Sequence, residues 1–185
     1  MAATIPAAAG EAEELFAKFL EKPGRETYLA VFKAVTEAES YDPYSMELNG
    51  AWDLIKERKF KEAQEKLEKA MPNLLLSPRA HSMAAMAAEG LDDAAKAKAE
   101  REAAAKCLDG MLATGDGSPD KPYLVTRVSD EYDLLRHLKK ARTSQGLRHK
   151  GGKAFDVMSC ADGTEVWFDI TVVFGSLSKR LKGKQ

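Results

Sequence analysis

A turn-rich segment near the middle of the chain separates two stretches with different patterns. It reads Gly115-Asp116-Gly117-Ser118-Pro119, and these residue types are typical of tight turns. Before it, alanine is abundant and apolar residues recur at helical spacing. After it, β-branched and aromatic residues gather in short runs. The sequence therefore predicts an α+β protein with a helical region over residues 1–114 and a small α+β region over residues 115–185, packed on the first.

Apolar stripes predict helices before this segment. The stripes are Leu15, Phe16, Phe19 and Leu20; Tyr28, Leu29, Phe32 and Val35; Leu48, Trp52 and Ile55; and Phe60, Ala63, Leu67 and Ala70. Pro23-Gly24 and Asp42-Pro43 end the first two, and a polar turn at 57–59 joins the last two. With the alanine-rich stretch that follows, we expect about three helical hairpins.

A short tetrad recurs in this helical region. Phe60-Lys61-Glu62-Ala63 resembles Leu91-Asp92-Asp93-Ala94, and the offset of 31 is near the unit of about 34 residues in tetratricopeptide repeats. Alanine-rich helices can approach one another closely, because alanine has the best helix propensity and a small side chain. The pattern predicts tetratricopeptide-like hairpins.

The second region reads as a β-α-β-β unit. Tyr123 to Val128 is typical of a strand, and a helix follows from Ser129, fraying at 143–146 into a loop with Gly151-Gly152. Asp162-Gly163 then joins two β-patterned arms, 153–160 and 165–173, as a hairpin. On the second arm, alternation predicts that Val166, Phe168 and Ile170 point one way while Trp167 and Asp169 point the other.

Positive and negative charges nearly balance over the whole chain. The chain has 28 Lys+Arg and 29 Asp+Glu, so net charge predicts neither nucleic acid nor membrane as a partner. Residues 1–114 carry an excess of acidic residues and residues 115–185 an excess of basic ones, a distribution that could draw the two regions together. The opening Met1 to Pro6 has no signal-peptide pattern, and no apolar run reaches membrane-spanning length. We expect a soluble protein, cytoplasmic unless a leader has been removed.

Two cysteines, Cys107 and Cys160, lie on opposite sides of the turn-rich segment. Two are too few for a disulfide framework, and they lack the spacing of metal ligands. We interpret both as small buried hydrophobes, with pairing between them left open.

Several segments together resemble a bacterial family known as domain of unknown function 4919. They are Gly115 to Pro119, Val125, Asp130 to Leu135, Phe155-Asp156-Val157, Trp167-Phe168-Asp169, Tyr41 to Tyr44 and Pro78 to His81. The resemblance covers most of the chain from about residue 25 onward. It supports the fold and implies no activity, cofactor or catalytic residue.

Five polar residues are candidates for binding: His81, Asp116, Tyr132, Asp156 and Asp169. Asp116 and Asp120, with Asp156 or Asp169, could offer oxygen ligands to calcium, but turn and strand roles explain them better, and we expect no metal or cofactor. Asp156 and Asp169 could also face each other across the hairpin as paired carboxylates. No nucleophile is fixed nearby by spacing, so we favour a non-catalytic protein.

Basic residues are concentrated from Arg136 to Lys153, a stretch without any acidic residue. They are Arg136, Lys139, Lys140, Arg142, Arg148, Lys150 and Lys153. The stretch could bind an anion or an acidic protein face, or it could be a solvated surface. It has no aromatic side chain for stacking on bases, which argues against single-stranded nucleic acid.

The sequence thus favours a protein- or peptide-binding module, because stacked helical hairpins present an extended face and the two regions differ in charge. A second hypothesis is a small enzyme or ligand-binding domain with a pocket at the seam, the junction between the helical region and the α+β region. His81, Asp116, Tyr132 and the hairpin aspartates would line this pocket. A third is an assembly role through an exposed sheet edge, which would give a stable dimer.

Overall fold

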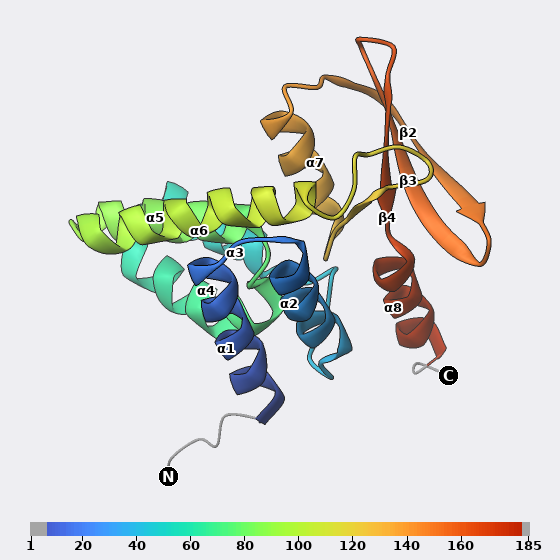
Figure 1. Ribbon diagram of the computed structural model, residues 1–185. Helices are drawn as coiled ribbons and strands as arrows, with labels where there is room; N and C mark the ends of the chain where they lie inside the picture. Colours follow the sequence, from blue (N-terminus) through green and yellow to red (C-terminus); the bar gives the residue numbers. More distant parts are fainter. Residues whose placement is uncertain (1–6, 183–185) are drawn as a thin grey trace.

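The computed structural model describes residues 7–182 and confirms the α+β architecture (Figure 1). Three helical hairpins come first and are built from six helices: α1 (Ala7–Glu21), α2 (Arg25–Glu37), α3 (Glu47–Lys56), α4 (Phe60–Leu74), α5 (Pro78–Gly90) and α6 (Ala94–Leu112). Helices α1 and α2, α3 and α4, and α5 and α6 pack as antiparallel pairs. The stripes predicted from the sequence lie on the faces that these helices bury, except that Trp52 is 41% exposed and Ala51 takes its place in the buried face of α3.

The second and third hairpins repeat the same turn. Arg58 and Asp92, which lie 34 positions apart, both have φ of 60°. In each turn the next residue donates a backbone hydrogen bond of 2.9 Å, from Lys59 to Leu54 and from Asp93 to Ala88. Three pairs of buried alanines share the spacing: Ala51 and Ala85, Ala63 and Ala97, Ala70 and Ala104. The predicted offset of 31 is therefore wrong, because Phe60 starts a helix whereas Leu91 ends one.

The remaining elements form a mixed sheet with two helices. They are β1 (Tyr123–Leu124), α7 (Val128–His137), β2 (Arg142–Lys150), β3 (Lys153–Cys160), β4 (Glu165–Asp169) and α8 (Thr171–Lys182). The strand order is β1-β4-β3-β2. Strand β1 runs parallel to β4, and the other neighbours are antiparallel. Figure 1 shows the sheet on one side of the helices, with β2 and β3 curving away from α1–α6.

Three of the predicted elements differ from the structure. The strand expected from Tyr123 to Val128 is limited to Tyr123–Leu124, and helix α7 already begins at Val128. The segment expected to fray into a loop is the long strand β2, and Gly151-Gly152 is its two-residue turn to β3, with φ of 58° and 76°. The arm expected to run to Val173 ends at Asp169, and helix α8 follows. Alternation along β4 is confirmed: Val166, Phe168 and Ile170 join the core, and register places Trp167 and Asp169 on the other face.

One core cluster connects the two regions. It combines Phe19 and Tyr28 of the first hairpin with Leu134 of α7 and with Met158 and Phe168 of the sheet. A second cluster lies between α3, α4 and α5. Within the first cluster, α6 comes close to its neighbours at Gly110, where an added Cβ would lie 2.3 Å from the Tyr28 ring. A small residue is required there because the rings of α1 and α2 fill that space.

Candidate functional site

The basic stretch of the sequence forms the free edge of the sheet. All nine residues of β2 are exposed, and β2 is the terminal strand in the sheet order. Within residues 7–182 no strand pairs with its outer side. An edge strand of this length presents a row of backbone donors and acceptors that another chain can pair with.

The turn fixes which backbone groups point outward. Lys150 and Lys153 close the two-residue turn, so their backbone groups bond to each other and the pairs alternate from there along the ladder. Gly146 and Arg148 thus bond to β3. Gln145, Leu147 and His149 direct their N–H and C=O groups to the free edge. The bond of 3.0 Å from Ile170 N–H to the carbonyl of Ala154, which faces His149, agrees with this alternation.

Several of the predicted basic residues are already engaged. Arg136 lies 3.0 Å from Asp133, and Lys140 donates to Asp162 at 2.9 Å. Lys150 is 3.6 Å from Asp120, with both side chains largely exposed, so this pair contributes little. Lys139, Arg142 and Arg148 form no ion pair within the described part of the chain.

A chain of hydrogen bonds runs inward from β2. The Tyr132 hydroxyl donates to the Gln145 side-chain carbonyl at 2.6 Å, and the Gln145 amide donates to Asp156 at 2.7 Å. The Arg142 guanidinium lies 5.2 Å from the centre of the Tyr132 ring, a cation–π arrangement. Tyr132 and Asp156, two of the predicted site residues, are therefore brought together through Gln145.

This series of hydrogen bonds ends at Asp156, which lies near a second buried carboxyl group, that of Glu131. Glu131, on α7, is fully buried. Burial, with the charge of Asp156 next and that of Asp130 after it, raises the pKa of Glu131 to about 9, and neither of its carboxyl oxygens has a hydrogen-bond partner among the described residues. A carboxyl group with a pKa this far above its ordinary range keeps its proton at neutral pH, so Glu131 is neutral there.

Other polar groups are buried at the start of α7. Asp130 accepts hydrogen bonds from the backbone and hydroxyl of Thr126, and burial raises its pKa to about 7 despite the nearby charge of Arg127. The Arg127 guanidinium donates to the Asn73 carbonyl at 3.1 Å while its Nε has no partner. Such groups are costly to bury, so the start of α7 lowers the stability of the folded protein.

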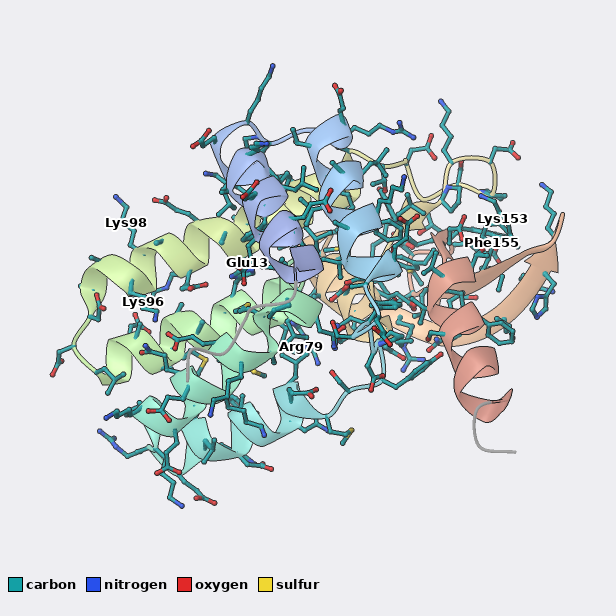
Figure 2. All side chains as sticks on the ribbon, turned by 90° about the horizontal axis from the view of Figure 1, so that it is seen from below. Glu13, Arg79, Lys96, Lys98, Lys153 and Phe155 are labelled. Carbon is teal, nitrogen blue, oxygen red and sulfur yellow. The ribbon has the colours of Figure 1, made fainter. Side chains whose placement is uncertain are left out.

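An ion pair ties α7 to the helical hairpins. Arg79 of α5 donates two hydrogen bonds to Asp133, at 2.8 and 3.1 Å. Asp133 is buried, and this bidentate geometry is the strongest form of such a pair. Figure 2 shows Arg79 near the middle of the molecule, and Lys153 and Phe155 at the sheet end.

Two of the predicted site residues, His81 and Asp116, lie elsewhere. His81 is buried among helices, 2.7 Å from Glu100 and 2.8 Å from the Leu75 carbonyl, with its ring stacked on Phe16. Asp116 accepts a bond from the Ser118 backbone in a loop beside β4, at the opposite edge from β2. Both are explained by these structural contacts.

Asp169 does not face Asp156, contrary to the paired-carboxylate hypothesis. Asp156 is opposite Phe168, and Asp169 is opposite Phe155, so the two aspartates point to opposite faces of the sheet. Asp169 instead accepts bonds from the Thr171 backbone and hydroxyl at the start of α8, and from Lys153 at 2.9 Å. Both cysteines are buried and unpaired, as interpreted from the sequence.

A surface groove lies away from Glu131 and Asp156. It has a volume of about 900 Å³ and runs between the end of α2 and the start of α8. Phe32, Tyr41 and Val172 are among its lining residues, and none of the predicted site residues is. Within the described ranges, no three His, Cys, Asp or Glu side chains gather as metal ligands, and no helix is long and apolar enough to cross a membrane.

The model of one protein family, described as "Domain of unknown function (DUF4919)", matches residues 26–182. The chain belongs to the DUF4919 family. This match begins in α2 and ends at the last residue of α8, so it includes both the hairpins and the sheet. No curated protein and no solved structure matches the chain.

Three residues of this candidate site are not indicated by the sequence patterns: Glu131, Gln145 and Leu147. An acidic residue in the first turn of a helix is typically a solvated partner of the helix dipole, so nothing marked Glu131 as buried. Gln145 and Leu147 fell in the segment interpreted as loop. One signal was available, because Gly-Gly between two extended runs is also a hairpin pattern.

Proposed function

We propose that this protein is a non-catalytic peptide-binding module that accepts an extended segment of a partner protein as an added strand on β2. The observation that carries the proposal is the free edge of β2, with outward backbone groups at Gln145, Leu147 and His149. Strand addition uses backbone hydrogen bonds for affinity and alternate side chains for specificity.

The rest of the fold supports the edge as a rigid platform. Strand β3, which holds β2, is buried over most of its length, and the Tyr132–Gln145–Asp156 bonds attach β2 to α7. A pre-ordered edge loses little conformational entropy on binding. The 34-residue spacing of the second and third hairpins further supports a tetratricopeptide-like scaffold, an architecture with extended binding surfaces.

A catalytic or ligand-binding pocket at the seam is less well supported. His81, Asp116 and Asp169 are held apart by their own structural contacts. Glu131 keeps a proton at neutral pH, as an acid catalyst would, but on the side of β2 Gln145 donates to the neighbouring Asp156 and is itself held by Tyr132.

The test is selection from a displayed library of random peptides of roughly ten residues, long enough to span β2. The selected peptides are then titrated against the wild-type protein and the variant Leu147→Pro. This substitution removes an outward N–H without touching the ladder to β3, a position that proline tolerates on an edge strand. Leu147→Val, which keeps the N–H and an apolar side chain, is the matched control.

We expect selected peptides to bind wild type and Leu147→Val alike and to lose at least about tenfold in affinity on Leu147→Pro. Methylating the peptide backbone should abolish binding only at alternate positions, since only alternate N–H groups face β2. A library without binders, or binders indifferent to Leu147→Pro, would overturn the proposal.

A further inference from the structure

The two faces of the free edge differ in chemistry. Register places Gln145, Leu147 and His149 on the face that carries Asp156 and Met158, which is the core side of the sheet. Gly146, Arg148 and Lys150 lie on the opposite face, with Phe155 and Val157. A strand added to β2 continues both faces, because its side chains alternate in step with those of its neighbour.

The core side of β2 presents an apolar ledge. Leu147 is 47% exposed at the centre of the strand, although its neighbours on β3 are buried. The ring of Phe174 lies 5.5 Å from that of His149 on one side of it, and the half-buried Tyr132 bonds to Gln145 on the other. An apolar side chain opposite Leu147 would remove this exposed surface from water, the main source of gain in such pairs.

The opposite face of β2 presents positive charge. Arg148 has no ion pair within the described residues, and the Lys150–Asp120 contact of 3.6 Å is exposed at both ends. No acidic residue lies between Arg136 and Lys153 in the sequence. Carboxylates directly opposite Arg148 and Lys150 would form cross-strand ion pairs there, whereas cationic side chains would be repelled.

We propose that the partner segment is an amphipathic strand in which acidic residues alternate with apolar ones, the acidic residues facing Arg148 and Lys150 and the apolar ones covering Leu147. This inference rests on the proposed function, since it assigns the chemistry of the strand that β2 accepts. It commits to an acidic protein segment. Binding therefore depends on the order of acidic and apolar residues in the partner segment, and not only on its charge.

The test uses three synthetic peptides of about nine residues, enough to span β2. The first alternates glutamate and valine, the second has the same residues in two blocks, and the third alternates lysine and valine. Affinities are measured by fluorescence anisotropy at low and high salt against wild type, the double variant R148E/K150E and the variant Leu147→Asp. Circular dichroism confirms that each variant is folded, as expected for exposed positions.

We expect the alternating acidic peptide to bind roughly tenfold more tightly than the block peptide, and to weaken with salt. R148E/K150E should reverse the preference in favour of the lysine peptide. Leu147→Asp should weaken both alternating peptides. Equal binding of alternating and block peptides, or an unchanged preference in R148E/K150E, would overturn this inference.

The library selection separates the two proposals. If selected peptides respond to Leu147→Pro but show no acidic–apolar alternation, strand addition stands and the inference about the partner fails. If no selected peptide responds to Leu147→Pro, the proposed function itself fails.

Discussion

Replacing Glu131 by glutamine removes the buried proton of the seam while keeping the shape of the side chain. In the folded protein Glu131 keeps its proton up to a pKa of about 9, whereas the unfolded chain releases it near 4.5. Between these values the folded state binds one more proton than the unfolded state. The free energy of unfolding therefore falls as pH rises through this window and levels off above it.

The size of the effect follows from the pKa difference. Each pH unit above 4.5 costs about 1.4 kcal/mol, so at pH 7.5 retaining the proton costs about 4 kcal/mol. Glutamine is neutral at every pH and has nearly the same shape as the protonated glutamate. We expect Glu131→Gln to be more stable than wild type by about 4 kcal/mol at pH 7.5, and by less than about 1 kcal/mol at pH 4.5.

Urea denaturation followed by circular dichroism between pH 4.5 and pH 9 measures this difference. Asp130 titrates in both proteins, so subtraction isolates the contribution of Glu131. Glu13→Gln, on the exposed face of α1 (labelled in Figure 2), is the control and should change stability by less than about 0.5 kcal/mol. A difference between Glu131→Gln and wild type that stays constant across pH would refute the reasoning.

Two further predictions concern packing and the seam. Gly110→Ala should lower the free energy of unfolding by about 2 kcal/mol, because the new methyl group meets the Tyr28 ring. Gly10→Ala, with no atom within 4 Å of its added Cβ, should raise it by about 0.5 kcal/mol. Opposite or equal shifts in the thermal midpoints of the two variants would contradict this. Arg79→Ala should cost about 2 kcal/mol, because it leaves the buried Asp133 with only the exposed Arg136 as partner. Arg79→Lys should recover less than half of this loss in urea denaturation, since lysine cannot donate two parallel bonds; full recovery would show that charge alone matters.

The sequence predicted the elements whose burial is one-sided. The stripes from Leu15 to Ala70 follow helical periodicity because each helix buries one face. The hairpin at Asp162-Gly163 could be predicted because the turn and the alternation of Val166, Phe168 and Ile170 agree. In both cases local preference and tertiary burial point the same way.

Strand β2 could not be predicted from periodicity. It is exposed on both faces, so nothing forces its residues to alternate, and only pairing with β3 makes it a strand. Helix α8 was not predicted because Val172 and Val173 favour strands. In the structure, Asp169 accepts hydrogen bonds from the Thr171 backbone and hydroxyl where this helix begins. The burial of Glu131 depends on how α7 packs against the rest of the fold, which no local pattern in the sequence indicates.

The most direct test of strand addition is amide hydrogen exchange along β2, measured by NMR with and without the tightest peptide from the library. In the free protein, the amides of Gly146 and Arg148 should be protected by β3, while those of Gln145, Leu147 and His149 should exchange rapidly. Peptide binding should protect these last three. Binding that leaves them unprotected would contradict the account, because the peptide would then occupy another surface.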